Sequence, residues 1–91
     1  MKTATYPAIF RVDEEEPKYI NVSIPDIWGA VTFGEGMEDA IYMAKDLLKL
    51  MLEDAPAQCY PPHSLEHTQE AFPGETVLMI TVEYDETKNN A

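Results

Sequence analysis

Basic residues, cysteine and long apolar runs are all scarce in this sequence of 91 residues. Six lysines and arginines stand against 17 aspartates and glutamates, which gives a formal net charge of −11. A field of this sign repels nucleic acid and anionic membranes, and it speeds encounters with basic partners. It also keeps a protein soluble, so the charge alone does not choose between solubility and the attraction of a basic partner.

The single cysteine, Cys59, excludes an internal disulfide and fits a reducing compartment. The first ten residues contain one lysine and no apolar segment of the kind found in signal peptides. The longest apolar run, Ala40–Ala44, is far too short to span a membrane. We therefore expect a cytoplasmic protein with no membrane partner.

The sequence also lacks the glycine spacings that bind phosphate. Gly29, Gly34 and Gly36 match neither G-x-G-x-x-G nor a P-loop, and no lysine follows them to reach a phosphate. Three carboxylates near the last of these glycines would repel a phosphate: Glu35, Glu38 and Asp39. We interpret the glycines as turn positions.

Patterns typical of metal sites and enzymes are weak. Cys59, His63 and His67 are spaced by four, but two prolines that follow the cysteine keep it off any helix that holds the histidines. The acidic run 13–16 could attract a divalent cation, yet two-metal hydrolysis needs carboxylates that converge from different elements. A metal-dependent nuclease using Asp13 is therefore a weaker alternative, and we expect no enzyme activity, no metal and no cofactor.

The hydrophobic pattern predicts three strands, one long helix and a final strand. Period-two alternation predicts the strands, and a charged turn at Asp13–Pro17 joins the first two as a hairpin. Apolar residues at i, i+3, i+4 and i+7 predict an amphipathic helix from Met37 to Glu53, which Pro56 ends. The predicted strands are 5–12, 19–25, 30–34 and 76–84.

Two predictions concern the second half of the chain. The segment 55–75 is a long, proline-rich connection, and loops of this length without secondary structure are often functional. In the last strand the apolar run Val77–Ile80 indicates burial on both faces, and hence a central position in the sheet. A helix between the third and fourth strands permits a parallel return.

The turn after the second strand contains Asp26 and Trp28. Asp26 follows a proline at a strand end, where a carboxylate commonly caps a turn. Trp28 lies between Pro25 and Gly29, a position where full burial is difficult. Its ring is either an exposed interface anchor or packed against the helix or a strand edge.

Taken together, these segments resemble the N-terminal domain of the HicB antitoxin family. The resemblance extends from Tyr6 to Ser64 and rests on the order and spacing of several short motifs. The matching residues are Tyr6–Phe10, the acidic turn, Ile24–Asp26, Gly29, Val31–Thr32, Gly34, Ala40, Ala44, Leu48 and Pro61–Ser64. One departure is Gly36, which stands at the helix N-cap where the family usually has threonine or serine.

The resemblance implies an α+β fold of β-β-β-α-β order, a partial RNase H-like domain with one helix packed on a small mixed sheet. We expect this domain over 1–86, followed by a tail over 87–91. Typical family members continue into a C-terminal DNA-binding domain, which we expect to be absent from this chain. No direct contact with nucleic acid is therefore expected through these residues.

The resemblance further implies the antitoxin of a type II HicAB toxin–antitoxin system. Its partner would be a HicA-type toxin, a small basic protein that cleaves mRNA and that the antitoxin binds and occludes. We also expect a homodimer or a higher oligomer. The alternative is a solitary HicB-like regulatory or ligand-binding module without a toxin. The candidate toxin-binding residues are Asp13, Glu14, Glu15, Glu16, Asp26, Trp28, Glu35 and Glu38.

Overall fold

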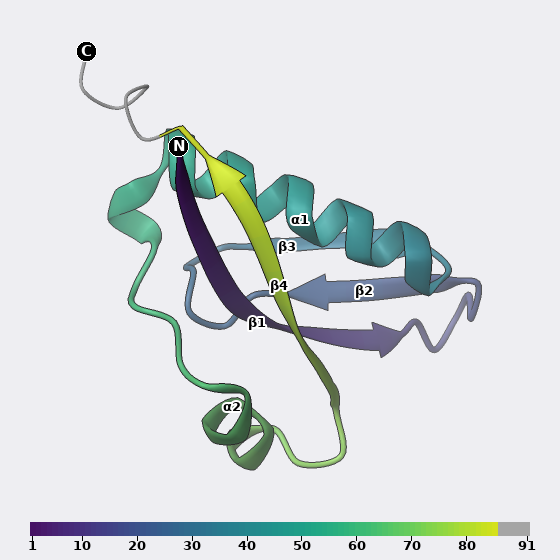
Figure 1. The fold of residues 1–91 in the computed structure, drawn as a ribbon. Helices are drawn as coiled ribbons and strands as arrows, with labels where there is room; N and C mark the ends of the chain where they lie inside the picture. The colour runs from purple at the N-terminus through teal and green to yellow at the C-terminus, as the bar shows by residue number, and fades with distance from the viewer. Residues whose placement is uncertain (86–91) are drawn as a thin grey trace.

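The computed structural model describes residues 1–85, which form a four-stranded sheet, one long helix and two short helical segments (Figure 1). The elements in chain order are β1 (Lys2–Val12), β2 (Tyr19–Ser23), β3 (Val31–Glu35), α1 (Met37–Asp54), a 3-10 helix (Pro56–Gln58), α2 (Leu65–Ala71) and β4 (Thr76–Tyr84). The predicted α+β class and β-β-β-α-β order are confirmed, with α2 as an addition. Residue 86 and the predicted tail lie outside the described residues.

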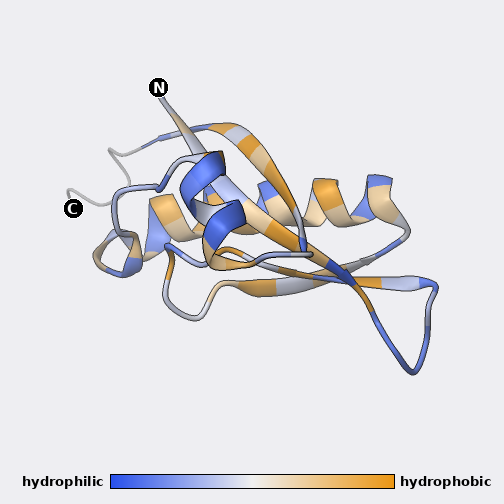
Figure 2. Ribbon diagram, turned by 90° about the horizontal axis from the view of Figure 1, so that it is seen from below, coloured by the Kyte–Doolittle hydropathy of each residue, from blue (hydrophilic) through white to orange (hydrophobic). Residues whose placement is uncertain are grey.

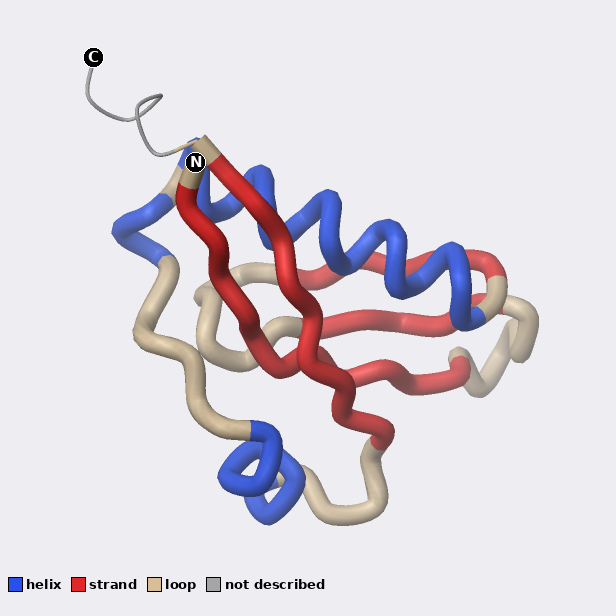
Figure 3. The backbone as a smooth tube through the Cα atoms, in the orientation of Figure 1, coloured by secondary structure: helices blue, strands red, loops and turns tan. Residues whose placement is uncertain are grey.

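The sheet has the strand order β3-β2-β1-β4, and all three pairings are antiparallel. The predicted mixed sheet is therefore wrong. Helix α1 runs back along the sheet from the end of β3, and the connection 55–75 then crosses the length of the molecule again (Figures 1 and 3). Because of this second crossing, β4 enters the sheet in the direction opposite to β1.

The central position predicted for β4 is also wrong, because β4 lies at an edge of the sheet beside β1. The apolar run Val77–Ile80 therefore does not reflect a central position in the sheet. Ile80 belongs to the core beneath α1, whereas Val77 is buried on the other side of the strand. An edge strand covered on both faces gives the same apolar run as a central strand.

Strand β1 is long enough to pair with different neighbours along its length. Residues Lys2–Phe10 pair with β4, and residues Ile9–Val12 pair with β2. Figure 1 shows β1 changing direction between these two halves. The sheet therefore has two parts, a β1–β4 ribbon and a β1–β2–β3 part, which share only Ile9 and Phe10 of β1.

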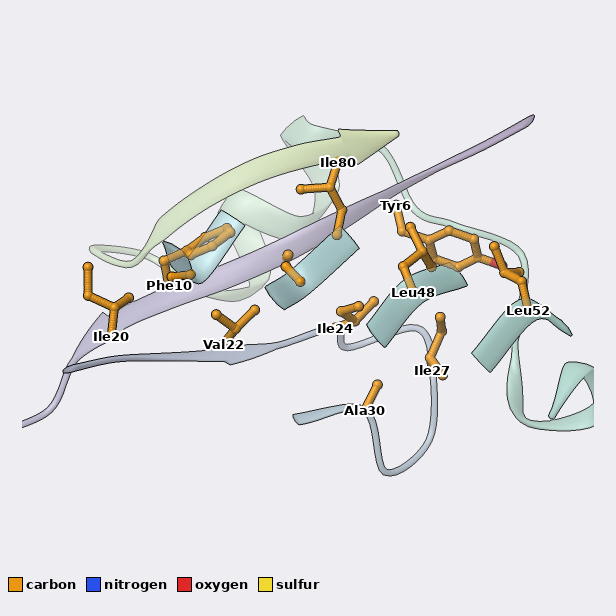
Figure 4. Close-up of a cluster of buried hydrophobic side chains, with 13 residues drawn as sticks. Tyr6, Phe10, Ile20, Val22, Ile24, Ile27, Ala30, Leu48, Leu52 and Ile80 are labelled. Atoms are coloured by element: carbon orange, nitrogen blue, oxygen red, sulfur yellow. The ribbon is translucent and has the colours of Figure 1, made fainter. Parts of the chain in front are cut away.

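The main core lies between α1 and one face of the sheet (Figure 4). On α1, Ala40, Ala44 and Leu48 are fully buried, so the periodic apolar face predicted from the sequence is the face that packs. The small side chains allow a close approach to β3. A Cβ atom added to Gly34 would lie 2.4 Å from the backbone nitrogen of Ala40. The glycine is needed here for contact with the helix.

The short helix α2 was not predicted from the sequence, where its residues lay in a long connection. Ser64 is its N-cap, and the Oγ atom accepts a hydrogen bond of 3.0 Å from the backbone N–H of His67. α2 contacts β4, its Thr68 is buried, and it lies at the bottom of Figure 1, away from α1. It covers the part of the second sheet face where Pro7 and Val77 are buried.

Within residues 1–85, no helix is both long enough and apolar enough to cross a membrane.

Substitution of Gly34 by alanine tests the close packing of α1 on β3. The added methyl group meets backbone atoms of Ala40, which cannot rotate away. Overpacking of this kind costs about 1–3 kcal/mol, and each kcal/mol lowers Tm by about 4–8 °C in a domain of this size. We expect thermal unfolding followed by circular dichroism to show a loss in this range or larger.

The matched control is Gly29→Ala, which meets no atom within 4 Å but has a φ of +79°. A side chain in this left-handed region costs about 1–2 kcal/mol. If Gly34→Ala lost no more stability than Gly29→Ala, the close approach of helix and strand would be contradicted.

Candidate partner-binding surface

The face of the sheet opposite α1 is covered only in part. Within residues 1–85, α2 packs at β4, and no helix covers this face of β2 and β3. Val31 is 70% exposed and Phe33 is 56% exposed, which is unusual for apolar side chains on a sheet. We call this region the open sheet face; its residues are Arg11, Tyr19, Asn21, Ser23, Val31 and Phe33. Ile9, which pairs with Ser23 beside them, is buried.

Cross-strand pairing arranges the open sheet face in rows. Val31 pairs with Ser23, and Ser23 pairs in turn with Ile9. In the next row Phe33 pairs with Asn21, which pairs with Arg11. A hollow of about 520 Å³ lies over these rows and is lined by Ile9, Arg11, Asn21, Val22, Ser23, Val31, Thr32 and Phe33.

An aromatic contact and an ion pair fix side chains at the edge of this hollow. The rings of Tyr19 and Phe33 meet edge to face with their centroids 5.6 Å apart, which is a favourable aromatic geometry. The guanidinium of Arg11 forms an ion pair with Glu75, which precedes β4. The positive charge of Arg11, on the β1 side of the open sheet face, is therefore matched by a carboxylate of the same chain.

Most of the candidate acidic residues lie together at one end of this face. The β1–β2 loop, residues 13–18, projects from the sheet as the hydrophilic turn seen in Figure 2. The turn from β3 into α1 lies beside it, because the backbone N–H of Gly36 donates a 2.9 Å hydrogen bond to the carbonyl of Lys18. The structure thus brings Glu35 and Glu38 to the same end as the run 13–16, and we call this group the acidic end.

Within the acidic end, Asp13 shapes the loop. Its carboxylate accepts a 2.9 Å hydrogen bond from the backbone N–H of Glu16 and a 3.0 Å hydrogen bond from the Nδ2 of Asn21. These two bonds lower the pKa of Asp13, the backbone bond contributing most. Glu14, Glu15 and Glu16 are exposed. The loop thus presents three glutamates around one internally bonded aspartate.

Asp26 is placed elsewhere and is 7% exposed. Its carboxylate accepts a 2.9 Å hydrogen bond from the backbone N–H of His63 and lies 2.5 Å from the Nδ1 of the same histidine. The carbonyl of Asp26 accepts a hydrogen bond from Tyr60. Asp26 therefore fastens the connection after α1 to the turn between β2 and β3, which is a structural role.

Tyr6 strengthens the same junction from β1. Its hydroxyl donates a 2.8 Å hydrogen bond to the carbonyl of Tyr60. Burial raises the pKa of the Tyr6 hydroxyl, and the nearby Cys59 and Asp26 raise it further. This junction joins residues more than 30 positions apart in sequence, so local patterns could not have revealed it.

Trp28 is 71% exposed, as expected for an interface anchor rather than a core residue. It lies in the β2–β3 turn, and its backbone N–H donates to the carbonyl of Gln58. This turn is at the other end of the β2–β3 hairpin from the acidic end. At about 3.3 Å per strand residue, the two ends lie roughly 15 Å apart, so one partner must be broad to contact both.

The cysteine and the two histidines noted in the sequence do not converge. The rings of His63 and His67 stack with centroids 4.3 Å apart, and His63 is engaged by Asp26. The thiol of Cys59 donates a 3.6 Å hydrogen bond to the carbonyl of Ala55, and burial raises its pKa. Among the described residues, no three histidines, cysteines or acids are arranged to hold a metal ion.

No family model and no curated protein matches the sequence. Solved structures do share the fold. The N-terminal domain of antitoxin HicB from Burkholderia pseudomallei superposes with a TM-score of 0.71 and 21% identity, covering 88% of this chain and 99% of that one. The longer antitoxin HicB from the same organism gives a TM-score of 0.72 and 19% identity, covering 88% of this chain and 64% of that one.

A third structure is a chain of a toxin–antitoxin complex from Streptococcus pneumoniae, with a TM-score of 0.70 and 18% identity. The match covers 97% of this chain and 73% of that chain. This protein therefore shares its α+β fold with a chain of a toxin–antitoxin complex. More specifically, it has the fold of the HicB antitoxin N-terminal domain.

The pH dependence of unfolding tests the role of Asp13 in the loop. Because its pKa is lower in the folded state, its ionised form stabilises the fold above the unfolded pKa of 3.8, and this contribution is lost as pH falls through the folded pKa. We expect Asp13→Ala to lower Tm at pH 7 and to differ less from the unsubstituted protein at about pH 2.5.

Glu14→Ala is the control, since this side chain is an exposed neighbour in the same loop. We expect it to leave Tm nearly unchanged at both pH values. An Asp13→Ala effect of equal size at both pH values would show that the carboxylate charge does not hold the loop.

Proposed function

We propose that this chain is the antitoxin of a HicAB-type toxin–antitoxin system and that it acts by binding its toxin. The observation that carries the proposal is the agreement with the HicB N-terminal domain over 99% of that domain. Nearly complete coverage of a compact domain, with the helix and strands in the same arrangement, is a stronger argument than a shared helix–sheet motif. Because fold alone does not define function, the surface chemistry supplies the second argument.

That surface suits a basic partner. The formal charge of −11 attracts a basic toxin at long range. The acidic end adds a local concentration of carboxylates next to an exposed apolar surface, a combination typical of interfaces. A toxin that binds RNA must itself present basic groups to phosphates. The proposed antitoxin would compete for those groups and occlude the RNA-cleaving site.

The proposal assigns no enzyme activity to the chain. The carboxylates of Asp13 and Asp26 already accept hydrogen bonds within the fold. The chain spans 64% of the longer HicB antitoxin, so activities of such a whole protein, including DNA binding, are not assigned to these residues. The proposed site of action is the cytoplasm, where mRNA is translated, and self-association into a dimer or larger assembly stays a prediction.

Co-expression tests the function directly. A small basic HicA-type toxin from the same genome is expressed alone and then with residues 1–91, and growth is followed. We expect the toxin alone to stop growth, co-expression to restore it, and the two proteins to purify as one complex.

The control is the single substitution Gly34→Ala, predicted above to weaken the fold. It should reduce rescue at elevated temperature more than at low temperature. Absence of both rescue and complex formation, with the domain shown to be folded, would contradict the antitoxin proposal and favour a solitary regulatory module.

A further inference from the structure

We propose that the open sheet face, together with the glutamates of the β1–β2 loop, is the docking surface for the basic toxin. The inference rests on the proposed function and names the surface and the chemistry of the contact. The partner would place apolar side chains over Val31 and Phe33 and direct lysine or arginine side chains at Glu14, Glu15 and Glu16.

The apolar part of the surface is continuous and preformed. Val31 and Phe33 project from the same side of β3, two residues apart, and both are more than half exposed. The ring of Phe33 is held by Tyr19, so little side-chain freedom is lost on binding. Exposed aromatic residues fixed in this way are the usual anchors of protein interfaces.

Two hollows at the acidic end are lined both by residues of the β1–β2 loop and by residues of the open sheet face. A hollow of about 440 Å³ is lined by Asp13, Glu15, Glu16, Tyr19, Asn21 and Phe33. A neighbouring hollow of about 350 Å³ is lined by Arg11, Val12, Asp13, Glu14, Glu15 and Asn21. One incoming side chain with an apolar stem and a cationic head would therefore contact Phe33 and the glutamates together. Lysine and arginine have this form.

The charges favour a basic partner over a second copy of this chain. Two copies that meet through this face bring together molecules that each carry a formal charge of −11. The basic groups close to the face are already engaged, since Arg11 pairs with Glu75 and the ammonium of Lys18 lies 5.1 Å from the centre of the Tyr19 ring. A basic protein instead gains from every exposed glutamate of the loop.

Binding of the toxin to two sets of variants tests the surface. The probe is an inactive variant of the HicA-type toxin from the same genome, and its Kd for each domain variant is measured by calorimetry. We expect Val31→Ser with Phe33→Ser to weaken binding by at least about tenfold, as for interface anchors. The matched control is Tyr42→Ser, which alters a 67% exposed side chain on α1 and should change Kd less than about twofold.

The second set of variants distinguishes the effect of the loop glutamates on binding from the effect of the total charge of the domain. Replacement of Glu14, Glu15 and Glu16 by glutamine should weaken binding and reduce its dependence on salt. The control replaces three exposed glutamates outside the acidic end, Glu66, Glu70 and Glu83, which removes the same total charge. We expect the loop variant to lose several-fold more affinity than this control.

The outcomes distinguish the two proposals. If the unsubstituted domain does not bind the toxin, the proposed function fails. If it binds but the Val31–Phe33 and loop variants bind as tightly as their controls, while all variants remain folded by circular dichroism, the function stands and this docking surface is wrong. Loss of self-association in the Val31–Phe33 variant with unchanged toxin binding would assign the face to a second copy and would also overturn the inference.

Discussion

The close approach of α1 to β3 at Gly34 is the constraint on which the rest of the structure depends. The first turn of α1 can lie this close to β3 only because no side chain projects from Gly34 toward the backbone of Asp39 and Ala40. The same approach places the start of α1 beside the β1–β2 loop, through the bond between Gly36 and Lys18. Packing in the core therefore gathers the carboxylates that form the acidic end.

Because α1 packs on one face of the sheet, the opposite face can be covered, among the described residues, only by those of the connection 55–75. Asp26 fastens this connection to the β2–β3 turn, and α2 then packs at β4. Seven helical residues cannot cover four strands, so the β2–β3 part remains open. A small domain thus keeps apolar side chains such as Phe33 at its surface, next to the glutamates that we propose attract a basic partner.

Local patterns in the sequence predicted the hairpin, the third strand, α1 and its glycine N-cap, because each depends on neighbouring residues. They failed for the direction and position of β4, which are set by the long connection 55–75. α2 could have been found from Ser64 as an N-cap. At the site, the acidic run was visible in the sequence, whereas the sequence left open whether Trp28 is exposed or packed. The structural use of Asp26 was not visible, because its partner His63 is 37 residues away.

The most direct test of the account is to map the toxin contact on the folded domain. Amide resonances of the isotopically labelled protein would be followed as inactive toxin is added. We predict the largest shifts at Tyr19–Ser23, at Val31–Glu35 and in the β1–β2 loop, with the exposed side of α1 unchanged. Shifts concentrated on α1 or α2, with β2 and β3 unaffected, would contradict the account.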